Sequence, residues 1–146
     1  MSARPSKKFL DNIRLFKRMS FYSIRNFVKE LPVNLRKKLP VEIKLIEIPT
    51  AESRKLNKIY RGKNKPTNVL SFKYSRDYGE ILLCPAVIKK EAKSQGNTYK
   101  YQFTWMVLHG MIHLAGVHHE ESQYSAIRAA RLEQKILIKI FGSLKS

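Results

Sequence analysis

Three histidines near residue 110 have the spacing of a metal site. The segment 109–119 reads HGMIHLAGVHH and places His109, His113 and His119 in the pattern H-x-x-x-H-x-x-G-x-x-H. Two histidines four residues apart on a helix lie on one face, one turn apart. Gly116 lets the chain leave the helix in a left-handed conformation, so His119 can return to the same point. Three converging imidazoles with an open fourth position are typical of catalytic zinc, and the sequence predicts one Zn²⁺ per chain.

The residue after the first histidine bears on the reaction. Zinc peptidases with this spacing have a glutamate there, which acts as the general base. This chain has Gly110, which cannot take a proton from water, and this argues against a peptidase. A zinc deaminase is disfavoured because the P-C-x-x-C signature is absent. The spacing favours His119 as the third metal ligand. His118, next to it, is expected to orient a metal-binding residue or to contact substrate.

The charge of the chain favours a polyanionic partner. Lysine and arginine number 29 against 11 acidic residues, a formal net charge of +18. A field of this size attracts nucleic acid and accelerates the encounter. No apolar run is long enough to cross a membrane, and a membrane is not an expected partner.

Length and composition indicate one domain over 1–146, with the basic, aromatic-rich segment 1–40 as part of it. That segment lacks a secretory apolar region, and Cys84 is the only cysteine, so no intrachain disulfide can form. The expected location is therefore the cytoplasm. An organelle is the alternative if 1–40 includes a transit peptide, since it is rich in arginine and poor in acids.

Apolar periodicity predicts an α+β fold, with helices packed around a small mixed sheet. Predicted helices are 20–31, 50–60 with Thr50 as N-cap, 87–94, 99–114 and 122–141, and predicted strands are 41–48, 69–72 and 80–84. Segment 9–16 fits a strand or a helix. The segment 99–114 is apolar nearly all round, so it should be a buried central helix that carries the first two histidines.

A second group of polar residues surrounds Arg61. This arginine is predicted to end a helix and to precede a basic loop and a short strand that could form one wall of a cleft. A guanidinium there could hold a phosphate with two hydrogen bonds and stabilise charge that develops at phosphorus. The simpler interpretation is a solvated basic loop that joins two elements.

Two long motifs resemble those of one family. The run HGMIHLAGVHHE is similar to the YbeY signature H-G-x-L-H-L-x-G-Y-D-H. The upstream run LNKIYRGKNKPTNVLSF is similar to the family block L-N-x-x-Y-R-x-x-x-x-P-T-D-V-L-S-F, and Gly79-Glu80-Ile81 resembles a strand between them. The order and separations agree, and the resemblance covers roughly residues 42–120.

The resemblance implies a zinc-dependent, single-strand endoribonuclease. Its expected role is ribosomal RNA maturation, notably at the 3′ end of small-subunit rRNA, and ribosome quality control. Motif positions put the zinc ligands on His109, His113 and His119 and the functional arginine on Arg61, so that His113 and Arg61 are the expected catalytic residues. The family fold implies four strands with about five helices around them. Ribosomal subunits and assembly factors, including a GTPase, are the implied partners.

The chain departs from the family pattern at two places. Asn68 stands where the family has Asp, and Val117-His118 replaces Tyr-Asp. Expected RNA contacts come from these residues: Lys63, Lys65, Asn68, Ser71 and His118. Tyr60 or Tyr74 could stack on unpaired bases. The nucleophile stays open between zinc hydroxide and the RNA 2′-hydroxyl. The alternative functions are a non-catalytic rRNA-binding assembly factor with structural zinc and another zinc-dependent hydrolase.

Overall fold

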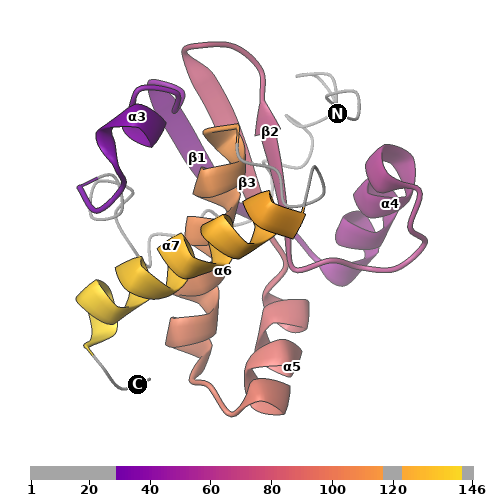
Figure 1. Ribbon diagram of the computed structural model, residues 1–146. Helices are drawn as coiled ribbons and strands as arrows, with labels where there is room; N and C mark the ends of the chain where they lie inside the picture. Colours follow the sequence, from indigo (N-terminus) through magenta and orange to yellow (C-terminus); the bar gives the residue numbers. More distant parts are fainter. Residues whose placement is uncertain (1–28, 117–122, 143–146) are drawn as a thin grey trace.

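The computed structural model describes residues 29–116 and 123–142 (Figure 1). Within these ranges the elements are α3 (Val33–Arg36), β1 (Glu42–Glu47), α4 (Thr50–Arg61), β2 (Val69–Lys73), β3 (Tyr78–Leu83), α5 (Pro85–Gln95), α6 (Tyr99–Leu114) and α7 (Gln123–Phe141). The α+β class predicted from the sequence is confirmed. Most of the predicted helix 20–31 and the whole of segment 9–16 lie outside the described residues, and residues 29–31 form a turn and a bend.

The described strands form one mixed sheet in the order β1-β3-β2. β1 runs parallel to β3, and β2 runs antiparallel to it. The central strand is therefore β3, and Ile81 on it lies between Leu45 of β1 and Ser71 of β2. A fourth strand, which the family resemblance implied, is not among the elements of the described ranges.

Alternation along the strands builds two apolar layers, one on each face of the sheet. Leu45, Ile81 and Leu83 pack with α6, whereas Ile46, Leu70 and Leu82 pack with Leu56 of α4. Successive strand side chains point to opposite faces, so the alternating pattern predicted for 41–48 serves both layers. Helix α4 covers one face, and α5, α6 and α7 gather on the other (Figure 1).

Helix α6 is the buried central helix that the sequence predicts. Its N-cap is Thr98, whose side chain accepts a hydrogen bond from the Tyr101 backbone N–H at 3.1 Å. Buried side chains occur on nearly every side of it, including Phe103, Val107, Leu108 and Met111. Burial also raises the pKa of Tyr99, at its first turn, to about 12, so this phenol stays neutral and packs as an aromatic ring. A helix held this firmly can position polar side chains accurately.

Two local predictions need correction. Thr50 was the predicted N-cap of α4, but it is the first helical residue, and Pro49 occupies the cap without a side-chain hydrogen bond. The extended conformation of Pro49 already directs its carbonyl to the Ser53 N–H at 3.0 Å, so the helix begins one residue earlier. The four-residue α3 was not predicted, because a single turn carries no readable periodicity.

No helix in the described part of the chain is both long and apolar enough to cross a membrane.

Candidate metal centre

His109 and His113 lie together on the part of α6 that is not fully buried. Their ring centroids are 4.7 Å apart, and the two planes are inclined by 44°. The spacing of four residues thus places both imidazoles on one face, as the sequence predicts. The His109 side chain is 28% exposed, so a ligand from solvent can reach it.

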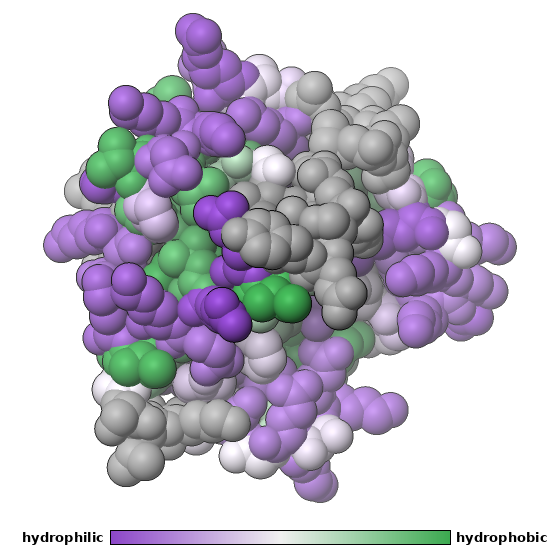
Figure 2. All heavy atoms as spheres, viewed as in Figure 1, coloured by the Kyte–Doolittle hydropathy of each residue, from purple (hydrophilic) through white to green (hydrophobic). Residues whose placement is uncertain are grey.

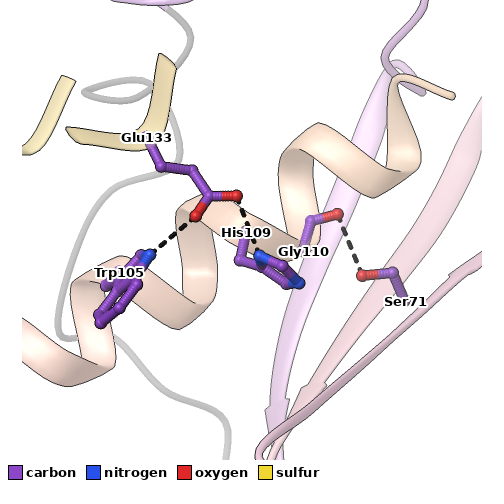
Figure 3. Close-up of polar contacts among 5 residues, drawn as sticks. All are labelled: Ser71, Trp105, His109, Gly110 and Glu133. Atoms are coloured by element: carbon purple, nitrogen blue, oxygen red, sulfur yellow. Dashed lines mark hydrogen bonds and ion pairs between the residues drawn. The ribbon is translucent and has the colours of Figure 1, made fainter. Parts of the chain in front are cut away.

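A carboxylate from α7 holds the first of these histidines. Glu133 lies 2.9 Å from His109, measured from Oε2 to Nδ1, and its Oε1 accepts a hydrogen bond of 2.8 Å from the Trp105 indole N–H. Figure 3 shows Glu133 reaching down from α7 to both residues of α6. Because a carboxylate can only accept, the neutral His109 ring carries its hydrogen on Nδ1 and presents the Nε2 lone pair. This is the arrangement by which proteins orient a metal-binding histidine.

The opposite side of α6 packs directly against the sheet at Gly110. The Ser71 hydroxyl of β2 donates to the Gly110 carbonyl at 3.0 Å, on the side away from Glu133 (Figure 3). A β-carbon at Gly110 would lie 2.8 Å from the Ile81 γ2-methyl, closer than real β-carbons approach. The position of the peptidase glutamate therefore faces the core here, and no larger side chain fits without rearrangement. Ser71, predicted as an RNA contact, is engaged with the helix backbone.

The predicted third ligand, His119, lies outside the described residues. His118 and His119 fall in 117–122, outside the described residues, and the remainder contains no group of three or more metal-ligating side chains. Gly116, the last described residue before that segment, has the left-handed φ of 90° that the sequence predicts. Its N–H donates to the His113 carbonyl at 2.9 Å, so the helix ends directly after the second histidine.

Asn68, the first departure from the family pattern, has a specific partner. Its side-chain amide donates to Glu91 Oε1 of α5 at 2.9 Å. An ionised aspartate at this position could not donate and would face a like charge. The amide therefore suits a chain with a glutamate at 91. Asn68 also lines the same cavity as His109.

Arg61, Lys63 and Lys65 lie at the end of α4 and in the loop that follows it. Arg61 is the last residue of α4 and is exposed, and Gly62 ends the helix with a φ of 71°. Helix α4 packs on the sheet face opposite α6. Hydrophilic side chains dominate the side of the molecule that carries α4 (Figure 2).

The loop that carries these cations is braced to α4. The buried Asn57 side chain donates to the Lys65 carbonyl at 2.8 Å. Ser53 Oγ donates to the Thr67 carbonyl at 2.7 Å and accepts from the Thr67 N–H at 2.8 Å. The exposed cations Lys63 and Lys65 thus extend from a fixed backbone that leads to Asn68, just before β2.

Comparison with known proteins identifies the family of this chain. A family profile described as "Endoribonuclease YbeY" matches residues 13–140. The chain belongs to the YbeY family. The match spans all the described elements from α3 to α6 and most of α7, so the paired histidines and Glu133 lie within the family domain.

Individual YbeY relatives agree with this assignment. A protein named Endoribonuclease YbeY from Pseudoalteromonas translucida is 36% identical over 106 residues, 68% of this chain and 69% of that one. One of the same name from Bdellovibrio bacteriovorus is 42% identical over 89 residues, 59% of each chain. A solution structure of a Thermotoga maritima protein shares 29% identity, covers 82% of this chain and 81% of its own, and superposes with a TM-score of 0.55.

Sequence reasoning did not single out Glu133 or Trp105. The available indication was the register of the last helix: Glu133 follows the buried Ala129 by four residues and precedes the buried Leu137 by four. An acid on the apolar face of a helix needs a partner, because an isolated buried carboxylate is costly. Its partners come from another helix, however, and the pattern of α7 alone does not name them.

Proposed function

We propose that this YbeY-family chain is a single-strand-specific, zinc-dependent endoribonuclease in ribosomal RNA processing, notably at the 3′ end of small-subunit rRNA, and in ribosome quality control. Family membership supports the endoribonuclease activity. The observation that carries the metal-dependent site is the pair of imidazoles 4.7 Å apart, one of them held by Glu133. The net charge of +18 supports binding to an RNA backbone, and ribosomal subunits and assembly factors, including a GTPase, are the proposed partners.

The donor set fits zinc. His109 and His113 are nitrogen ligands from one helix face, and His119 is the proposed third ligand. The Glu133 carboxylate would fix the ring orientation of His109 and increase the basicity of its Nε2. When bound, the metal would supply Lewis-acid activation of the phosphodiester.

The other residues of the chain would hold and polarise the substrate. Arg61 would stabilise negative charge at the phosphoryl oxygens, and Lys63 and Lys65 would hold the RNA backbone from their braced loop. Gly110 leaves the helix without a general base at the peptidase position, which disfavours peptide hydrolysis. The cut therefore depends on the metal site and on Arg61, with either water or the RNA 2′-hydroxyl as the attacking group.

Cleavage of a 3′-extended small-subunit rRNA tests this function. We expect the purified protein to cut it, and Arg61→Ala to lower kcat about 100-fold because one charge-stabilising donor is lost. Arg76→Ala, which removes another exposed cation, from the β2–β3 turn, serves as the matched control and should cut within a few-fold of wild type. The 3′ termini of the products are read in the same assay, and a 2′,3′-cyclic phosphate would identify the 2′-hydroxyl as nucleophile.

Equal cleavage by all three proteins would mean a contaminating nuclease and no role for Arg61. RNA binding without any cleavage would favour the alternative, a non-catalytic rRNA-binding assembly factor with a structural zinc, which takes the charge of the chain as its main property.

Glu133→Gln tests the orientation of the first histidine. The Gln carbonyl can still accept from Trp105, but its NH₂ would face His109 Nδ1 and favour the tautomer that carries the hydrogen on Nε2. We expect zinc affinity to fall about 10- to 100-fold, measured by competition with a chromogenic chelator. Glu42→Gln, an exposed acid on β1, controls for the loss of one negative charge. Unchanged zinc affinity in Glu133→Gln would exclude an orienting role.

A further inference from the structure

A cavity of about 340 Å³ lies beside His109, between α5, α6 and α7. This is within the range of about 300–1,000 Å³ typical of small-ligand pockets. Its walls include Asn68 just before β2, Glu91 and Gln95 of α5, Gln102, Trp105 and His109 of α6, and Glu133 of α7. Chain segments far apart in sequence therefore meet next to the candidate metal centre.

The charge of this cavity is opposite to that of the molecule. The chain as a whole carries a net charge of +18, yet the charged side chains among the described residues of the wall are the carboxylates of Glu91 and Glu133. A phosphate group is repelled by such a wall, whereas a neutral group with hydrogen-bond donors is attracted. The cavity thus suits a different part of an RNA chain from the part that the surface cations attract.

Hydrogen bonds hold the polar walls in place before any ligand enters. The Gln102 side chain is buried, and it donates to Gln95 Oε1 at 3.2 Å while it accepts from the Asn97 side chain at 2.8 Å. Asn68 donates to one oxygen of the partly buried Glu91, and a carboxylate has a second oxygen that can accept from a ligand. An acceptor fixed in this way selects for a donor at a defined position.

Trp105 connects the cavity to the metal centre. Its indole lines the cavity, and its N–H is bonded to Glu133, the same carboxylate that contacts His109. Figure 3 shows Trp105 and His109 on the same side of α6, one turn apart. Aromatic rings are the surfaces on which proteins stack unpaired bases. A base beside Trp105 would therefore have its phosphate close to the two histidines.

We propose that this cavity binds one nucleobase of single-stranded RNA next to the scissile phosphodiester, and that Glu91 favours bases with an exocyclic amino group, such as cytosine and adenine, over uracil. The amino group of cytosine or adenine donates to the Glu91 carboxylate, whereas the corresponding uracil oxygen O4 faces it as a second acceptor. This inference rests on the proposed ribonuclease function, since it names how that site recognises its substrate.

Trp105 is the only tryptophan of the chain, so tryptophan fluorescence comes from one residue in the wall of this cavity. The probes are cytidine, adenosine and uridine 5′-monophosphates, with ribose 5-phosphate as the baseless control, added to the full wild-type chain. None contains a phosphodiester, so binding is measured without turnover. We expect saturable quenching by the cytidine and adenosine nucleotides, about tenfold weaker binding of the uridine nucleotide, as for one charged hydrogen bond lost, and no quenching by ribose 5-phosphate.

Glu91→Gln provides the discriminating variant. The glutamine NH₂ can donate to uracil O4, so the preference for cytidine over uridine should disappear or reverse. Glu52→Gln on α4, on the other face of the sheet, makes the same change away from the cavity and should keep the wild-type preference. Equal quenching by ribose 5-phosphate, no saturable quenching at millimolar nucleotide, or an unchanged preference in Glu91→Gln would each overturn the proposal. If the wild-type protein showed base-dependent quenching but did not cut rRNA, the base site would stand and the proposed nuclease function would be refuted.

Discussion

Replacing His113 with alanine should remove bound zinc and lower the rate of RNA cleavage by at least about 1,000-fold. Two imidazoles of α6 face one another at 4.7 Å, and a site that loses one of its proposed three ligands no longer holds the metal that activates the phosphodiester. Zinc content by mass spectrometry of the native protein and single-turnover cleavage of a 3′-extended rRNA measure the two effects separately.

A folded variant is required for that comparison. His113 is only partly buried, so its truncation leaves the apolar layers intact, and the circular dichroism melting curve should stay close to that of wild type without added zinc. Lys100→Ala, an exposed truncation in the first turn of the same helix, should retain both zinc and cleavage. If His113→Ala cut RNA at the wild-type rate, the histidine site would have no part in catalysis. If it lost zinc while RNA cleavage persisted, the zinc would be structural.

Gly110→Glu, which would restore the peptidase pattern, should instead unfold the protein. The added β-carbon would lie 2.8 Å from the Ile81 γ2-methyl and 3.0 Å from the Ser71 hydroxyl oxygen. A carboxylate forced into that contact has neither space nor a paired charge, and the expected loss exceeds about 3 kcal/mol in the free energy of unfolding. Urea denaturation, followed by far-ultraviolet circular dichroism, measures the loss.

Gly110→Ala separates the steric effect from the charge. Overpacking costs about 1–3 kcal/mol, and alanine recovers about 1 kcal/mol of helix propensity, so a net loss of about 1 kcal/mol is expected. In an Ile81→Ala background the closest contact is removed and the Ser71 hydroxyl oxygen at 3.0 Å remains, so the same substitution should cost less than it does in wild type. Wild-type stability of Gly110→Glu, with gained peptidase activity, would contradict the packing argument.

The main helices and strands could be predicted because each has a regular pattern of apolar residues within its own segment. The alternating apolar pattern of 41–48 predicted β1, and the apolar run of 99–114 predicted α6 to the residue. Gly116 was predicted in the left-handed conformation and has it. These predictions succeed because neighbouring residues of one element determine them. The predicted N-cap of α4 was wrong. The conformation of Pro49 starts that helix, and the side chain of Thr50 makes no capping hydrogen bond.

Three features could be predicted from the sequence alone. They are the family motifs, the helix that places His109 and His113 on one face, and the lack of a general base at position 110, which is glycine. Only the tertiary structure decided that Glu133 holds His109, since 24 residues separate them and the packing of α7 on α6 brings them together. The Asn68–Glu91 pair, 23 residues apart, likewise depends on the packing of α5 beside β2. Helical spacing is a local property that a sequence displays, whereas partners on different elements meet only after the apolar faces of those elements have packed.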